Sequence, residues 1–292
     1  MIKTKYKGGE NIPIEREQNM EKVVHIITSK DGTQIAFERT GHGPALILVG
    51  GAFEYRAMDS ETAQLATFPL LTQNFTVFHY DRRGRGDSTD TPPYAVEREI
   101  EDIEALINEA GGSAFLSGTS SGAALAMEAT IKLDGKVKKL AMYEAPYNDG
   151  ENAREALRKF RKQLQEVLLQ GRRGDAVGLF MTFLGVYGVP ADQLEGMRQL
   201  PTWPMWEGVA HTLAYDAAIL GEDGSVPTKK AARITAPTLV MDGGASFPFM
   251  HETAMALAKA IPNAQHRTLE GQAHEFAAEA VAPVLVEFFK AQ

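Results

Sequence analysis

The sequence predicts an α/β fold: a mostly parallel central sheet flanked by helices on both faces, with one long helical insertion. Three observations predict it. Short, continuous apolar runs alternate with segments of helical periodicity, and most of the runs end in glycine or polar residues. Residues 147–230 break the alternation, because they contain helical segments and no convincing strand. The alternation then resumes, so the strands on both sides of the insertion belong to one sheet.

The first half of the chain supplies strands and helices in turn. Residues 23–41 read as two strands joined by a turn at 30–32, and the apolar runs 45–49 and 75–80 follow as buried strands. Between these two runs we expect a helix over 60–72. An amphipathic helix over 96–110 ends at a glycine pair, a usual stop signal. A strand at 114–116, a helix from Ser121 and a strand over 138–143 complete this half.

After the insertion the pattern predicts a strand over 237–241, a helix near 250–260, a strand over 265–269 and a final helix over about 276–290. We therefore divide the chain into three parts. Residues 1–20 form a poorly ordered leader, residues 21–146 and 231–292 form the α/β core, and residues 147–230 form a helical cap on that core.

The composition favours a small-molecule substrate as the partner. The chain has 292 residues and a net charge of −8, which argues against nucleic acid or an anionic membrane. It has no cysteine, which excludes disulfides, a thiol nucleophile and thiolate zinc sites and fits a cytoplasmic location. No apolar run approaches membrane-spanning length, and the N-terminal residues lack the hydrophobic segment of a signal peptide.

The stretch Gly118-Thr119-Ser120-Ser121-Gly122 carries the strongest chemical signal. It follows a predicted strand, precedes a predicted helix and reads G-x-S-x-G with Ser120 at its centre. A serine on so sharp a turn has a strained backbone and an exposed hydroxyl, and side chains at the flanking glycines would collide with the crossing strand and helix. Ser120 is therefore the candidate nucleophile.

Three further polar residues fall where predicted strands end. Glu144 and Asp242 each end a strand, and His274 lies in the loop after the last one. Ligand sites of open parallel sheets lie at the carboxyl ends of the strands, so these residues and Ser120 should share one edge. A serine hydroxyl needs a histidine to take its proton, and the histidine needs an acid to orient it. The order nucleophile, acid, histidine along the chain is the one expected for such a site in this architecture.

With these motifs the chain resembles the α/β-hydrolase fold superfamily from residue 21 to residue 292. The resemblance rests on Gly50-Gly51 after the third strand, the Asp81-x-Arg83-Gly84-x-Gly86-x-Ser88 loop, the Gly118–Gly122 turn, the PTLV run before Asp242, and His274. Many relatives carry histidine where this chain has Gly50. The resemblance implies that the backbone amides of Ala52 and Ser121 form an oxyanion hole. It implies no cofactor and no metal.

The acid is open between two carboxylates. Many relatives place an aspartate a few residues beyond the seventh strand, and the matching position here is Ser246. Asp242 is near but lies at the strand end. Some relatives, certain haloalkane dehalogenases among them, instead place a glutamate in a setting like Tyr143-Glu144-Ala145. We prefer Glu144 as the catalytic acid and keep Asp242 as the alternative.

The predicted activity is hydrolysis of a small carboxylic ester, thioester or lactone through an acyl-enzyme on Ser120. A C–C bond hydrolase or a cofactor-free haloperoxidase (perhydrolase) would use the same three residues, and a non-catalytic receptor on the same scaffold is a rival of another class. The aspartate nucleophile of dehalogenases and epoxide hydrolases is absent. Some apolar and aromatic residues of the cap and of the loop after the third strand should line the substrate pocket, and the alternative is that the cap residues only dock the cap onto the core. The candidates are Phe53, Phe180, Met181, Phe183, Trp203 and Trp206.

Other conspicuous residues have simpler explanations. The cluster Arg82, Arg83 and Arg85 could meet an anionic substrate, but a structural role is favoured. His79 lies inside a predicted strand and should be a core residue. The other histidines show no metal-ligand spacing in the sequence: His25, His42, His211, His251 and His266.

Overall fold

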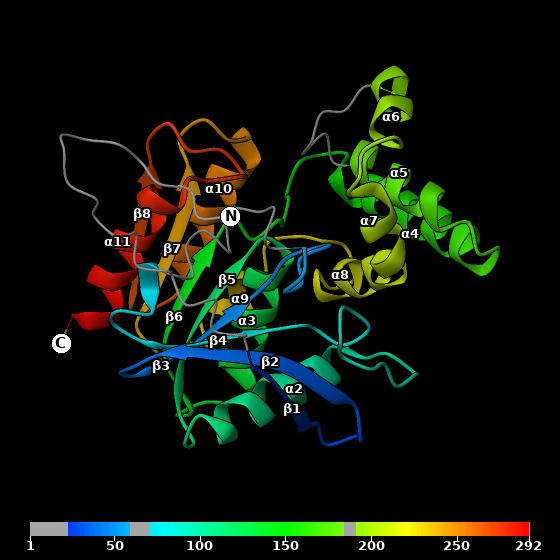
Figure 1. Cartoon of the computed structure of the whole chain (residues 1–292). Helices are drawn as coiled ribbons and strands as arrows, with labels where there is room; N and C mark the ends of the chain where they lie inside the picture. Colours follow the sequence, from blue (N-terminus) through cyan, green and yellow to red (C-terminus); the bar gives the residue numbers. More distant parts are fainter. Residues whose placement is uncertain (1–22, 59–69, 184–190, 292) are drawn as a thin grey trace, which may run out of the picture.

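The structure is a computed structural model, and the residues described are 23–58, 70–183 and 191–291. An eight-stranded sheet forms the centre, with the strand order β1-β2-β4-β3-β5-β6-β7-β8. The first two strands, β1 (Val24–Thr28) and β2 (Gln34–Gly41), are antiparallel to each other, and β2 is antiparallel to β4. The remaining neighbours are parallel. The predicted mostly parallel sheet flanked by helices is confirmed (Figure 1).

The parallel strands occupy the centre and one edge of the sheet. They are β3 (Ala45–Val49), β4 (Thr76–Tyr80), β5 (Ala114–Thr119), β6 (Val137–Tyr143), β7 (Thr238–Gly243) and β8 (Ala264–Leu269). Each expected strand has formed within a few residues of its predicted bounds. The helix expected over 60–72 falls largely on residues 59–69, which lie outside the described residues.

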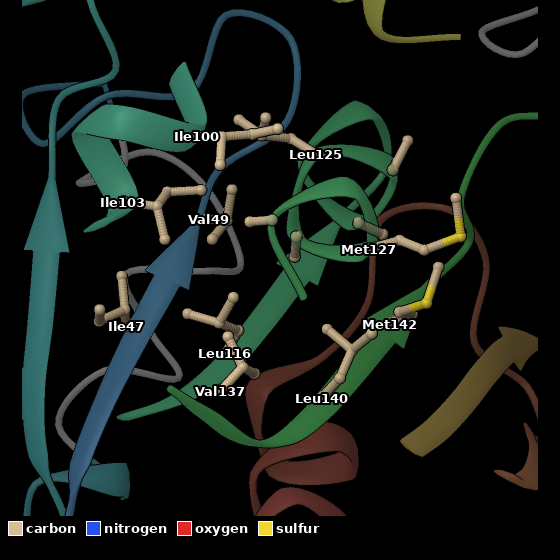
Figure 2. Close-up of a cluster of buried hydrophobic side chains, with 14 of the residues drawn as sticks. Ile47, Val49, Ile100, Ile103, Leu116, Leu125, Met127, Val137, Leu140 and Met142 are labelled. Atoms are coloured by element: carbon tan, nitrogen blue, oxygen red, sulfur yellow. The ribbon is translucent and has the colours of Figure 1, made fainter. Parts of the chain in front are cut away.

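Both faces of the sheet are buried, which explains why the strands read as continuous apolar runs. Along β3, Ile47 and Val49 face one cluster, whereas Leu46 and Leu48 face the other. Helices α2 (Val96–Glu109), α3 (Ser121–Lys132) and α10 (Pro248–Ala260) cover the first face, where Figure 2 shows the side chains of α2 and α3 packed over β3, β5 and β6. Helix α11 (Ala278–Lys290) covers the second face.

The described residues between β6 and β7 form helices joined by turns and loops, without a strand. The helical elements are α4 (Ala153–Leu169), α5 (Arg173–Thr182), α6 (Ala191–Met197), α7 (Trp203–Val209), the 3₁₀ turn η3 (Ala210–Thr212), α8 (Leu213–Ile219) and α9 (Thr228–Ala231). Helices α4 to α8 gather on one side of the molecule, apart from the sheet (Figure 1). Their aromatic and aliphatic side chains form a third cluster with Phe53, Tyr55 and Met58 of the loop after β3.

Helix α8 joins this helical segment to the core, because it packs against α3 and α2. The insertion is thus anchored beside the helix that begins at Ser121. None of the helices in the described ranges is long and apolar enough to span a membrane.

Candidate active site

Ser120 lies between the end of β5 and the start of α3, on a turn that only a glycine-flanked sequence can make. Its φ is 56° and its ψ is −129°, a conformation that L side chains rarely adopt. A Cβ at Gly122 would lie 2.1 Å from the carbonyl oxygen of Val49, and one at Gly118 would lie 2.4 Å from the carbonyl oxygen of Gly122. Since neither position has room for a side chain, α3 crosses close over β3 and presents the Ser120 hydroxyl to solvent-accessible space.

His274 lies between Ser120 and Glu144. Its Nε2 is 3.2 Å from Ser120 Oγ, and its Nδ1 is 2.7 Å from Glu144 Oε2. The second contact fixes the tautomer with the proton on Nδ1, which leaves the Nε2 lone pair for the serine hydroxyl. The side chain of His274 is 11% exposed and that of Glu144 is fully buried, so solvent reaches the imidazole but not the carboxylate.

The loop that carries His274 is fastened to the ends of β6 and β7. Tyr143 donates its hydroxyl hydrogen to the carbonyl oxygen of Ala273. The Ala245 amide donates to the carbonyl oxygen of Gln272 at 2.8 Å. A Cβ at Gly243 would lie 2.3 Å from that same oxygen, so the close approach requires glycine.

Glu144 directly follows β6, and its carboxylate is held by the turn after β7. Oε1 accepts the Gly243 amide at 2.8 Å, and Oε2 accepts the Ser246 hydroxyl at 2.9 Å as well as the contact from His274. Ser246 occupies the position where the resemblance would place an aspartate. Here it supplies a hydrogen-bond donor to a carboxylate that comes from the neighbouring strand.

Backbone strain is concentrated at this edge of the sheet. Within the described residues, the non-glycine positions with positive φ are Phe53, Ser120 and Glu144, at 65°, 56° and 48°. Ser120 and Glu144 each sit directly after a parallel strand, and Phe53 lies in the loop after β3. Conformations of this kind persist only where surrounding packing imposes them, and they cluster at functional sites.

Asp242 does not join this group. Its carboxylate lies against His251 and His266, at 2.9 Å and 2.6 Å. Along β7, Val240 and Asp242 point to the face covered by α10, because side chains alternate along a strand. The resemblance favoured Glu144 over Asp242, and the structure brings Glu144 alone of the two to His274.

The amides of Ala52 and Ser121 belong to two segments that arginines hold in place. Arg85 donates to the carbonyl oxygens of Gly51 and Glu54, and Arg82 donates to that of Gly50 at 3.2 Å. These bonds fix the loop on either side of Ala52. Ser121 is the first residue of α3, where the helix offers its amide no carbonyl partner.

Asp216 of α8 connects both arginines to Ser121. Its carboxylate accepts from Arg82 at 2.7 Å, from Arg85 at 2.8 and 3.0 Å, and from the Ser121 hydroxyl at 2.8 Å. Burial of Asp216 raises its pKa, but the positive charges of Arg85 and Arg82 outweigh that effect and hold the pKa below its ordinary value. The carboxylate is therefore ionised and fully engaged.

The structural role predicted for the arginine cluster is confirmed. Arg82 also pairs with Glu99, and Arg83 pairs with Asp31 and Asp102. All three arginines are almost completely buried and none faces open solvent. His79 is likewise buried within β4, as expected of a core residue.

A pocket of about 530 Å³ opens beside Ser120 and His274. Its wall is mostly apolar and comes from the helical segment, the β6–α4 connection and α10. The lining residues are Ala52, Ser120, Ser121, Pro146, Leu157, Phe160, Phe180, Phe183, Leu213, Asp216, Ala217, Leu220, Met250 and His274.

Of the residues proposed for the pocket, Phe180 and Phe183 are among the lining residues, whereas Phe53, Met181, Trp203 and Trp206 are not. Trp203 is 4% exposed and packs against Trp206 and under the guanidinium of Arg198. Phe53 contacts the rings of Phe180 and Trp206. The two tryptophans and Phe53 thus form a layer behind the pocket wall, because the aromatic surface of the insertion is used to pack its own helices together.

Comparison with known proteins agrees with this architecture. The family model described as "Alpha/beta hydrolase family" matches residues 42–282. The chain belongs to the alpha/beta hydrolase family. An alpha/beta hydrolase from Sphaerobacter thermophilus DSM 20745 is 51% identical, with a TM-score of 0.81 over 91% of this chain and 100% of that one. Its hydrolase relatives mark this protein, too, as a hydrolase.

More distant members of the family carry different names. A proline iminopeptidase, PfmaB, from Pestalotiopsis fici is 24% identical over 84% of this chain and 90% of its own. A thermophilic esterase from Thermogutta terrifontis has a TM-score of 0.70 at 24% identity, over 92% of this chain and 98% of its own. At this identity the likeness to the esterase shows the fold alone, so the substrate must be argued from the pocket.

Replacing Asp216 by asparagine should destabilise the protein strongly. The substitution keeps the shape but removes the negative charge that compensates Arg82 and Arg85, and leaving buried charges uncompensated costs about 3–5 kcal/mol. Urea unfolding monitored by circular dichroism measures the loss. Glu155→Gln, which breaks the exposed pair with Arg158, is the matched control and should leave stability nearly unchanged. Equal small effects of both substitutions would contradict the role given to Asp216.

Proposed function

We propose that the protein is a serine hydrolase that cleaves a small carboxylic ester, thioester or lactone through an acyl-enzyme on Ser120. The observation that carries the proposal is the chain of contacts from Ser120 Oγ through His274 to Glu144. A hydroxyl, an imidazole and a buried carboxylate in this order are what nucleophilic acyl transfer requires. The 3.2 Å contact between Ser120 and His274 is long, as is common before substrate binds.

Each step follows from a group at the site. His274 Nε2 takes the Ser120 proton as Oγ attacks the acyl carbonyl, and the amides of Ala52 and Ser121 donate to the oxygen on which negative charge develops. The proton on His274 then passes to the leaving alcohol or thiol. Water, deprotonated by the same nitrogen, releases the acyl group from Ser120. The Glu144 carboxylate, in contact with His274 Nδ1, balances the positive charge that His274 carries in between.

The pocket supports an uncharged, apolar substrate. Its wall is built mainly from aliphatic and aromatic side chains, and the polar side chains among its lining residues are those of Ser120, Ser121, Asp216 and His274. Asp216 is committed to two arginines and to Ser121. A charged amine, such as the free N-terminus of a peptide, would need an available carboxylate there. This commitment favours ester, thioester or lactone substrates over the peptide substrate of the iminopeptidase relative.

A fluorophosphonate probe should label Ser120 and abolish hydrolysis of p-nitrophenyl esters. Ser120→Ala should lower kcat by about 10⁴-fold or more, because no other group replaces the nucleophile. Peptide mass spectrometry locates the label, and Ser117→Ala in β5 is the control, which should be labelled and active like the natural chain. A label on Ser117 or Ser121 would contradict the assignment. If the natural chain is neither labelled by the probe nor able to hydrolyse any of the esters, a non-catalytic receptor is favoured.

Glu144→Gln should lower kcat by about 10⁴-fold while the protein stays folded. The amide cannot balance the imidazolium and favours the wrong tautomer of His274. Asp242→Asn should lower kcat far less, since its carboxylate faces other histidines. Steady-state kinetics of both variants, with circular dichroism as a check on folding, separate the two carboxylates. The assignment fails if Asp242→Asn is the more damaging of the two.

Phe180→Ala should shift the preferred acyl or alcohol chain toward longer substrates, because the change enlarges a pocket that Phe180 lines. Trp203→Ala should lower the melting temperature without a comparable shift, because Trp203 packs behind the wall. A series of p-nitrophenyl esters of increasing length, assayed beside lactones and a thioester, gives the preference. Identical chain-length profiles for Phe180→Ala and the natural chain would show that Phe180 does not bound the substrate.

A further inference from the structure

Asp242, His251 and His266 form a second cluster of chemically capable side chains, away from the Ser120 site. His266 Nε2 lies 2.6 Å from Asp242 Oδ1, and His251 Nδ1 lies 2.9 Å from Asp242 Oδ2. One ligand atom from each residue lies within 4.8 Å of the others. The three residues come from β7, α10 and β8, so three separate elements converge on one point.

The residue types match the preferences of zinc. Two imidazole nitrogens and one carboxylate oxygen make a three-ligand set in which water takes the fourth position. Imidazole suits Zn²⁺, whereas Mg²⁺ and Ca²⁺ prefer oxygen ligands. Tetrahedral Zn–N and Zn–O bonds of about 2.0–2.2 Å set the ligand atoms about 3.3–3.5 Å apart. The 2.6 Å spacing of His266 Nε2 and Asp242 Oδ1 would therefore have to open by about 0.7 Å, and the exposed His251 ring, which now contacts the other carboxylate oxygen, would have to shift.

The Asp242 carboxylate is buried at the centre of the cluster. The Asp242 side chain is 1% exposed, and its ion-pair partners within the described residues are the two histidines, with no lysine or arginine. A buried carboxylate is costly unless it is paired, hydrogen-bonded or coordinates a metal. A dipositive ion held by the three side chains would compensate its charge directly.

The cluster is also accessible. The His251 side chain is 52% exposed and that of His266 is 21% exposed, which leaves a path for an ion to enter and room for its water. The Thr268 hydroxyl, 3.3 Å from Asp242 Oδ1, can orient the carboxylate from outside the ligand set.

We propose that Asp242, His251 and His266 bind one Zn²⁺ ion per chain. The inference goes beyond the proposed hydrolase function and does not rest on it. The ion would tie α10 to the ends of β7 and β8. Its role is stabilising, because the next residue, Gly243, donates its amide to Glu144 and a fixed β7 end keeps that donor in place.

Isothermal titration of the full chain with ZnCl₂, after removal of metals with a chelator, tests the proposal. We expect one Zn²⁺ per chain, and at saturating Zn²⁺ a melting temperature higher by several degrees. His251→Ala should weaken binding at least about tenfold and abolish the thermal shift. This variant keeps its fold, because His251 is exposed on a helix, and Asp242→Asn should weaken binding in the same way. His42→Ala, at an exposed histidine elsewhere, should change neither quantity.

The result that overturns the proposal is equally specific. Absence of Zn²⁺ binding by the natural chain would make the cluster a purely hydrogen-bonded brace. Undiminished binding by His251→Ala, with binding lost in His274→Ala, would place the ion at the Ser120 site instead.

The metal site and the proposed hydrolase site are tested separately. Ser120→Ala should lose p-nitrophenyl ester hydrolysis and keep Zn²⁺ binding. If the natural chain hydrolysed no ester, the hydrolase proposal would fail and the result of the Zn²⁺ titration would still stand.

Discussion

The ion pairs of Asp216 with Arg82 and Arg85 hold the site together more than any other interaction. One buried carboxylate from α8 binds two arginines from the loop after β4 and the hydroxyl of Ser121, and the arginines in turn hold the carbonyls of Gly50, Gly51 and Glu54. The helical segment, the loop around Ala52 and the start of α3 are therefore fixed relative to one another. Since removing one member leaves buried charges unpaired, these groups act as a unit.

Strain at the edge of the sheet is maintained by this packing. Phe53, Ser120 and Glu144 each hold a positive φ, at a cost of about 1–3 kcal/mol per residue. The close crossing of α3 over β3, with glycine at 122, imposes the Ser120 conformation. The Glu144 conformation is held by two donors to its carboxylate, the Gly243 amide at the end of β7 and the Ser246 hydroxyl in the turn that follows. In this arrangement the hydroxyl, imidazole and carboxylate already lie in sequence, and only the 3.2 Å contact between Ser120 and His274 is long.

The sequence predicted the parts of the site that depend on local backbone geometry. Gly118 and Gly122 reveal the turn because no other residue fits, and the apolar runs reveal strands buried on both faces. Through the resemblance it favoured Glu144 over Asp242, but both lie at strand ends, and only the fold shows that the backbone after β6 turns Glu144 toward His274. It could not place Trp203 and Trp206, because an aromatic residue indicates burial but not which residues surround it. It missed that His251 and His266, fifteen residues apart, both contact Asp242, which the crossover from α10 to β8 brings about.

The Glu144 carboxylate, which follows β6, reaches His274 although the donors that hold it lie at and after the end of β7. Gly243 and Ser246 offer an amide and a hydroxyl, and Glu144 of the adjacent strand fills the space between these donors and His274. These hydrogen bonds satisfy both oxygens of the buried carboxylate. A serine at 246 is then a fitting residue, because an aspartate there would set two negative charges side by side. Glu144 after β6 and its donors Gly243 and Ser246 at the end of β7 therefore depend on each other.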